Sequence, residues 1–99
     1  MMYKPCHIVV TLCASYKYIT LCNELKYKFK CKGYNVLINN YILQDTIKQQ
    51  LIINKLNKQN ILLSDYIYII NTDNYIYHVI KDDIRYAKLN NIPIYYYMN

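Results

Sequence analysis

The chain has 99 residues, 55% of them hydrophobic, and a formal net charge of +6 at pH 7. This length suffices for one domain, residues 1–99, and the hydrophobic content predicts a packed core. The single glycine, Gly33, excludes the glycine-rich loops that cradle phosphates. No apolar run reaches the roughly 18 residues that span a membrane, so we expect a cytoplasmic protein with no membrane partner.

The basic residues are spread along the chain, and a solvated basic face is the simplest interpretation of them. A basic surface also attracts anions, but no recognised DNA-binding motif is present, so nucleic acid is not an expected partner. The four cysteines, Cys6, Cys13, Cys22 and Cys31, include no CxxC pair. We therefore expect no metal site and no cofactor. We interpret Cys13, Cys22 and Cys31 as small buried hydrophobes and expect a reducing compartment.

Hydrophobic spacing predicts strand, helix and strand in the first part of the chain. Residues 7–14 form a short β-rich apolar run. A helical stripe follows, with apolar residues spaced i, i+3, i+4, i+7 and i+11. Its members are Tyr18, Leu21, Cys22, Leu25 and Phe29. Gly33 is the candidate C-cap of that helix, and residues 35–38 are the second strand.

The next elements are predicted from capping residues and from a second β-rich run. Asp45 or Thr46 can cap a helix that runs to about Gln59. Residues 66–70 read YIYII, which is typical of a buried strand.

A helix and a strand complete the chain. Ile80, Ile84 and Ala87 form one apolar stripe of the helix, and residues 92–97 form the strand. Pro93 suits the start of that strand or an edge position, because proline cannot donate to a sheet ladder.

Alternation of strands and helices predicts an α/β fold: a single flavodoxin-like, Rossmann-like domain with helices on both faces of a parallel sheet. Right-handed crossovers give four strands in the order 2-1-3-4. In such sheets the ligand crevice lies beyond the carboxyl ends of the strands, where the order reverses. Here that point is between the first and third strands.

The loop after the first strand supplies three candidate ligand-binding residues, Ser15, Tyr16 and Lys17. They stand at a helix N-terminus, where free N–H groups favour an anion or a sugar hydroxyl. Ser15 can equally be only an N-cap. Tyr16 can stack on a base, although packing is the ordinary role of a tyrosine in a chain with fourteen of them.

The loop after the third strand supplies most of the remaining candidates. They are Asp73, Tyr75, Tyr77, His78, Asp82 and Asp83. Asp82 and Asp83 can simply complement the dipole in a first helical turn, or one of them can be a carboxylate nucleophile or base. His78 is more typical of a loop histidine than of a catalyst.

Three segments, read together, resemble the nucleoside 2-deoxyribosyltransferase-like family. VTLCASYKY resembles its CGSxRF start, and LKYKFKCKGYNVLI is similar to its LtlxGxxVlxP segment. The run at residues 64–97 resembles aDeiyVinvggYiGeStrxEIeYAxxxgKPvxY, and residues 83–87, DIRYA, are the most specific match. The resemblance covers nearly the whole chain except a shortened region at residues 39–46.

The resemblance implies a flavodoxin-like fold and a nucleoside or nucleotide ligand. In active members a glutamate that opens the last helix attacks the anomeric carbon of the sugar, and Asp83 stands at its position. The family's GxS glycine is Ala14 here, and its GxST loop is YHVI at residues 77–80. Glycine allows a close approach that these bulkier residues do not. Ser15, Asp65 and Tyr75 are retained.

Three functions follow as alternatives. The first, which we favour, is a binder of a nucleotide-derived ligand with little or no catalysis; the small size and AT-rich residue usage would suit a viral protein that captures a host nucleotide signal. The second is an active N-glycoside hydrolase or deoxyribosyltransferase that uses Asp83. The third is a protein-interaction module without a small ligand. Because active relatives complete each other's sites, we also expect a homo-oligomer, with residues 95–97 as a candidate dimer interface.

Overall fold

The computed structural model describes residues 8–39, 41, 46–70 and 78–97, with only the backbone at 78 and 79. Four parallel strands form one sheet in the order β2-β1-β3-β4. The strands are β1 (Val9–Ala14), β2 (Asn35–Asn39), β3 (Tyr66–Ile70) and β4 (Ile94–Tyr96). The helices are the short η1 (Tyr16–Tyr18), then α1 (Ile19–Cys31), α2 (Ile47–Leu63) and α3 (His78–Leu89). The chain therefore has the flavodoxin-like α/β fold and the strand order that its sequence predicts.

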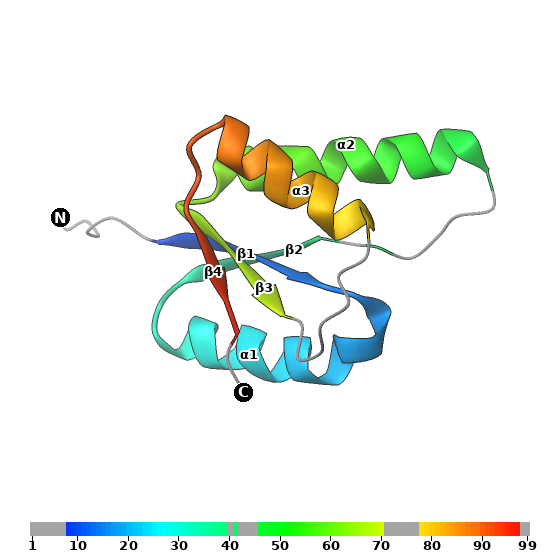
Figure 1. Cartoon of the computed structure of the whole chain (residues 1–99). Helices are drawn as coiled ribbons and strands as arrows, with labels where there is room; N and C mark the ends of the chain where they lie inside the picture. The colour runs from blue at the N-terminus through cyan, green and yellow to red at the C-terminus, as the bar shows by residue number, and fades with distance from the viewer. Residues whose placement is uncertain (1–7, 40, 42–45, 71–77, 98–99) are drawn as a thin grey trace, which may run out of the picture.

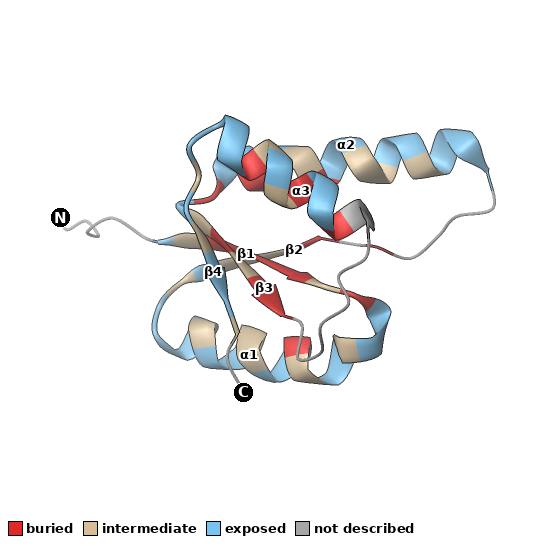
Figure 2. Ribbon diagram, in the orientation of Figure 1, coloured by how far each residue is buried: buried red, intermediate tan, exposed pale blue. Residues whose placement is uncertain are grey.

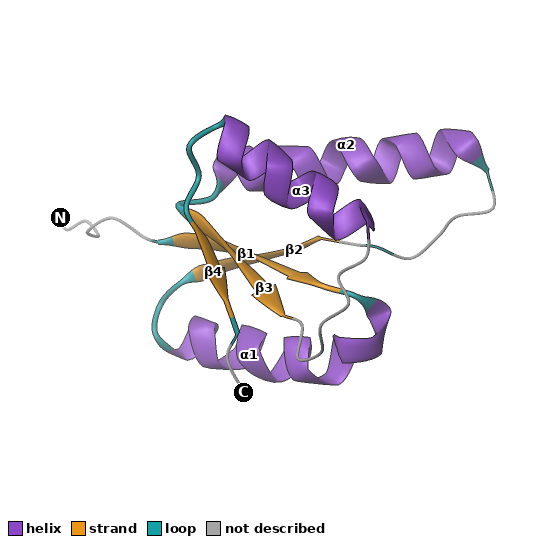
Figure 3. Cartoon of the chain, in the orientation of Figure 1, coloured by secondary structure: helices purple, strands orange, loops and turns teal. Residues whose placement is uncertain are grey.

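The helices lie in two layers, with α1 on one face of the sheet and α2 and α3 on the other (Figures 1 and 3). This follows from the strand pleat, which points successive side chains to opposite faces. On β1, Val10 and Leu12 belong to the core cluster that includes Cys22 of α1. Cys13 belongs to the other cluster, with Ile61 of α2 and Ile80 of α3. Figure 2 shows the buried residues concentrated on β1 and β3, whereas β4 is largely exposed.

The helix α2 differs in length from the helix that the sequence predicts. Its start agrees, because the Thr46 hydroxyl caps it by accepting a hydrogen bond from the Gln49 N–H at 3.1 Å. Its end is Leu63 rather than Gln59, so the predicted boundary is wrong. The added turn carries Ile61, which is fully buried against the sheet. Packing of that side chain extends the helix beyond the point where the sequence pattern weakens.

The position of Asp82 and Asp83 in helix α3 differs from one of the two interpretations of these residues. The helix starts at His78, so both aspartates lie in its second turn, and its first turn contains no acidic residue. Their interpretation as complements of the helix dipole is therefore wrong, because that effect falls off after the first turn. Ile80, a member of the predicted apolar stripe, is buried as expected, at 1% exposed.

A Schellman motif ends α1 at the position that the sequence predicts. The Gly33 N–H donates to the Lys30 carbonyl at 2.9 Å, and the Tyr34 N–H donates to the Phe29 carbonyl at 3.2 Å. Gly33 has φ +89°, in the left-handed region. The rings of Phe29 and Tyr34 stack with centroids 5.4 Å apart, which supplies the hydrophobic contact typical of the motif.

Replacement of Gly33 by alanine is expected to lower the free energy of unfolding by about 1–2 kcal/mol, the cost of a left-handed conformation for a residue with a Cβ. A Cβ at this position would meet nothing within 4 Å, so the backbone alone sets the effect. Urea unfolding at neutral pH measures it. Gly33→Asn is the control and should lose less, since asparagine tolerates this conformation. A Gly33→Ala variant as stable as the parent chain would contradict the argument.

The strand β4 forms one edge of the sheet. Pro93 directly precedes it, and the Pro93 carbonyl accepts a hydrogen bond from the Ile67 N–H at 3.0 Å. Proline therefore takes part in the ladder only as an acceptor, as its position in the sequence predicts. Tyr95 and Tyr96 remain about half exposed. Their role in a dimer stays a prediction.

Two further expectations can be compared with the fold. Cys13 and Cys22 are buried free thiols, as predicted, whereas Cys31 is exposed on the outer side of α1, so its predicted burial is wrong. None of the helices in the described ranges is long and apolar enough to cross a membrane.

Candidate functional site

Asp83 lies at the centre of a buried polar cluster rather than in an open crevice. It is 1% exposed. Its Oδ2 accepts from the Asn39 Nδ2 at 3.0 Å and from the Tyr41 hydroxyl at 2.5 Å. Its Oδ1 forms an ion pair with the Lys58 Nζ at 2.7 Å. Both carboxylate oxygens are thus bound by donors from other parts of the fold.

Two of the three donors, Asn39 and Lys58, belong to regular elements of the fold. Asn39 ends β2, and its Oδ1 accepts from the Asn60 Nδ2 of α2 at 3.0 Å. Lys58 extends from α2, and its ammonium lies 5.6 Å from the centre of the Tyr86 ring of α3. Among the described residues, no buried side-chain nitrogen or oxygen lacks a hydrogen-bond partner. The cluster is therefore a satisfied network that joins β2, α2 and α3.

Burial keeps the Cys13 thiol and the Tyr41 hydroxyl, both close to Asp83, protonated at pH 7. Desolvation raises the pKa of the Cys13 thiol to about 12, and the nearby Asp83 charge raises it further than the Lys58 charge lowers it. Desolvation, together with Cys13 and Asp83, raises the pKa of Tyr41 well above its usual value of 10.0. Tyr41 is therefore a neutral phenol at pH 7, and it acts as a hydrogen-bond donor to Asp83.

A cavity of about 290 Å³ lies beside this cluster, at the carboxyl ends of β1 and β2 and the start of α1. It lies on the β2 side of β1, whereas the sequence predicts a crevice between β1 and β3, and no residue of β3 lines it. Its lining residues are Ala14, Tyr16, Ile19, Cys22, Ile38, Asn39 and Tyr41. No aspartate, glutamate, lysine, arginine or histidine is among them, and burial raises the pKa of the Cys22 thiol. Asn39 and Tyr41 thus belong both to the cavity wall and to the group of donors around Asp83.

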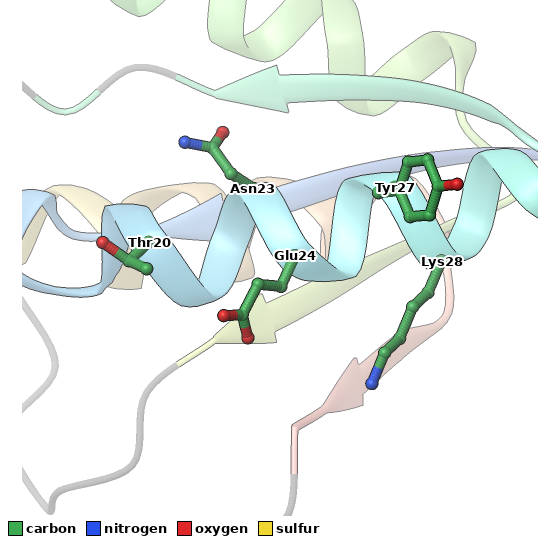
Figure 4. Close-up of a pocket in the computed structure, with 5 residues that line it drawn as sticks. All are labelled: Thr20, Asn23, Glu24, Tyr27 and Lys28. Carbon is green, nitrogen blue, oxygen red and sulfur yellow. The ribbon is translucent and has the colours of Figure 1, made fainter.

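Two other hollows are open surfaces. The residues that line the first all come from α1: Thr20, Asn23, Glu24, Tyr27 and Lys28. Figure 4 shows these side chains pointing away from a single helix, with no opposing wall among them. The second, about 480 Å³, lies at the amino end of β2, away from the predicted crevice. Neither shares a residue with the Asp83 cluster.

The structure gives the residues of the first predicted loop different environments. Tyr16 is 67% exposed and lines the cavity. Ser15 is buried and precedes η1, and its backbone carbonyl, not its side chain, accepts from the Tyr18 N–H at 2.9 Å. The Lys17 ammonium lies 5.6 Å from the centre of the Tyr18 ring. Of the three, Tyr16 is thus the one that lines the cavity.

The second predicted loop is mostly outside the described residues. Asp73, Tyr75 and Tyr77 lie there, as does the side chain of His78. Asp82 is an exposed residue of α3 and forms an ion pair with Arg85 at 3.0 Å. Its carboxylate is in solvent, so it does not join the cluster around its neighbour.

Asp65 lies at the opposite end of the sheet from the cavity. Its Oδ2 accepts from the Val9 N–H at 2.8 Å, where β1 begins. It therefore helps to start the pairing of β1 with β3, which is a structural role. The retention of this residue in the family pattern does not make it part of a pocket.

Sequence reasoning did not find three residues of the cluster, Asn39, Tyr41 and Lys58. One signal was present for Asn39, a polar residue that continues the apolar run VLI and so stands at the carboxyl end of its strand. Lys58 has no such signal, because it reads as one of several lysines on a surface helix.

Comparison with known proteins finds no matching family model and no significant similarity to a curated protein or to a solved structure.

Proposed function

We propose that the chain binds a nucleoside- or nucleotide-derived ligand in the cavity at the carboxyl ends of β1 and β2, without chemically converting it. The observation that carries this proposal is the complete burial of Asp83 beside an open, uncharged cavity. The family resemblance motivates the ligand class, and the geometry supports binding over catalysis.

The surroundings of Asp83 argue against a role of its carboxylate as a nucleophile. A carboxylate that attacks a sugar carbon must reach it with a free oxygen lone pair at about 3–3.5 Å. Here one oxygen is bound by an ammonium and the other by a phenol and an amide, and the side chain is 1% exposed. Hydrogen bonds to the charged form also lower the reactivity of its lone pairs. Asp83 is better suited to hold its three partners than to attack a substrate.

The cavity has the character of a site for one flat, uncharged group. Its volume of about 290 Å³ is just below the range of about 300–1,000 Å³ that is usual for ligand pockets, so it suits a base or a nucleoside more than a larger cofactor. The exposed ring of Tyr16 stands at its wall, beside Ile19, which is 45% exposed. An aromatic ring at a pocket entrance is suited to stacking on a base.

Such a protein would act by lowering the free concentration of its ligand. We propose this mode of action, capture in the cytoplasm by a small viral protein, as the biological form of the function. It requires a dissociation constant below the ligand concentration in the cell, and it requires no turnover.

The test is chromatography with mass spectrometry on the purified chain after incubation with nucleosides, mononucleotides and cyclic nucleotides. We expect an intact ligand to be depleted from the filtered solution and recovered after heat denaturation. At 100 times its dissociation constant, the same ligand should stabilise the fold by about 2.7 kcal/mol. Tyr16→Ala should weaken binding by about 5- to 100-fold if the ring stacks on a base.

Tyr27→Ala is the matched control, because Tyr27 is 71% exposed on α1 and lies outside the cavity. It should bind as the parent chain does. Free base that accumulates in proportion to the protein, and that disappears with Asp83→Asn, would instead establish the glycosidase alternative. Absence of binding across the whole panel would leave the interaction-module alternative.

A further inference from the structure

The first ten residues of α2, 47–56, contain no buried residue. The buried residues of this helix are Asn57 and Ile61, both in its second half. Figure 1 shows the first half extending beyond α3, and Figure 2 shows that it is largely exposed. This projecting half nevertheless contains large apolar side chains.

Those apolar side chains, together with two from the second half of the helix, form two rows on the outer surface of α2. One row is Ile47, Leu51 and Leu62, and the other is Ile52, Leu56 and Leu63, as follows from 3.6 residues per turn. All six are between 49% and 82% exposed. Exposed apolar side chains gathered in this way on one helix, rather than scattered singly over a surface, mark interaction sites.

The helix is also too weakly supported to stand alone. A helical segment shorter than about 12–15 residues is marginal in water, and most helical stability in proteins comes from packing of an apolar face. The projecting half has two isoleucines and two leucines that are at least half exposed, and it packs no fully buried residue against the sheet. Packing of these side chains against another surface would therefore stabilise this half of the helix.

The charges on this helix indicate the chemistry of what encloses it. Lys48 and Lys55 are exposed and stand between the two apolar rows, seven residues apart on one side of the helix. No aspartate or glutamate occurs in α2. The third lysine, Lys58, is already paired with Asp83. The outer surface of α2 therefore carries apolar and basic side chains and no acidic ones.

We propose that the projecting half of α2 binds in an apolar groove of a partner protein whose floor carries carboxylates. In such helix-in-groove recognition, the two apolar rows meet the groove walls, and acidic residues between those walls face Lys48 and Lys55. A second copy of this chain fits less well, because it would bring the same lysines and a net charge of +6 against one another. A lipid surface meets a helix on one side only, so it could not cover two rows that are separated by lysines.

Calcium-loaded calmodulin is the probe for this chemistry, because calcium opens a methionine-rich apolar groove in an acidic protein. Titration of the full chain with it should give a dissociation constant of about 1 μM or tighter, corresponding to roughly 8 kcal/mol. Binding should disappear when calcium is chelated. Leu51→Gln with Leu56→Gln should weaken binding at least tenfold, in the range found for anchors buried in an interface.

Leu89→Gln is the matched control, because Leu89 is 75% exposed on α3, outside this surface. It should leave binding unchanged. Charge reversal at Lys48 and Lys55 should also weaken binding, whereas reversal at exposed Lys81 of α3 should not. Circular dichroism shows whether each variant keeps its helices.

Three results would overturn the proposal. The first is no calcium-dependent binding at about 100 μM, which corresponds to less than 6 kcal/mol. The second is a dimer in sedimentation that Leu51→Gln with Leu56→Gln dissociates, which would assign the surface to a second copy. The third is that the chain binds anionic vesicles but not calmodulin, and that Leu51→Gln with Leu56→Gln abolishes the vesicle binding. That result would assign the surface to lipid.

Discussion

Asp83→Ala is expected to lower the free energy of unfolding by about 3–5 kcal/mol, the usual cost of removing one partner from a buried ion pair. The substitution leaves the Asn39 amide and the Tyr41 hydroxyl without their shared acceptor, and it leaves the Lys58 ammonium without its counter-ion. Domains of this size have only about 5–15 kcal/mol of total stability, so this variant should be partly unfolded near body temperature. Urea unfolding followed by circular dichroism measures the effect.

The adjacent aspartate supplies the control. Asp82→Ala removes an exposed carboxylate whose partner is Arg85, and exposed pairs contribute only about 0–1 kcal/mol. A second variant tests the mechanism: Lys58→Met with Asp83→Leu replaces both charges by apolar groups and should recover part of the lost stability. Equal stability of Asp83→Ala and Asp82→Ala would show that the cluster does not hold the helices together.

Stability is expected to fall steeply above pH 9, because the folded chain keeps protons that the unfolded chain releases. The pKa of Cys13 is raised from 9.0 to about 12 by burial, and the pKa of Tyr41 is raised well above 10.0. A group whose pKa is raised by folding keeps its proton in the folded chain at a pH where the unfolded chain has released it. Its contribution to the free energy of unfolding is therefore complete below the unfolded-state pKa and is lost as the pH rises toward the folded-state pKa. One group contributes about 1.4 kcal/mol per pH unit, so Cys13 alone should cost about 4 kcal/mol between pH 9 and 12.

Urea unfolding at intervals from pH 7 to pH 11.5, with a reductant present, follows this loss. Cys13→Ala should flatten the decline between pH 9 and 10, before tyrosines ionise in the unfolded chain. Cys31→Ala is the matched control, because Cys31 is exposed on α1, and its curve should run parallel to that of the parent chain. A Cys13→Ala curve with the parent slope would show that the thiol is not the group that titrates.

The parts of the fold that could be predicted are those that rest on local patterns. β3 has the predicted bounds because YIYII is a β-branched and aromatic run between polar residues. Gly33 ends α1 as predicted because the left-handed position there needs a glycine. The strand order follows from alternation and crossover handedness, which are properties of the whole chain.

The parts that could not be predicted depend on contacts between distant segments. The helix α2 ends beyond the predicted residue because Ile61 packs into the core, a tertiary effect that overrides a weak local signal. Asp83 was identified as a residue of interest, but its partners were not. Asn39, Tyr41 and Lys58 come from three separate stretches, and no spacing in the sequence links them to it.

The parallel sheet also sets the order in which the chain can assemble during synthesis. β1 pairs with β2 through residues such as Val9 and Asn35, but its pairing with β3 joins Val10 to Tyr66. One side of β1, a central strand of the sheet, therefore stays unpaired until about two thirds of the chain has been made. An open apolar edge of this kind is prone to association with other chains. Yield during expression should therefore depend on how the nascent chain is protected at this stage, more than on the final stability of the fold.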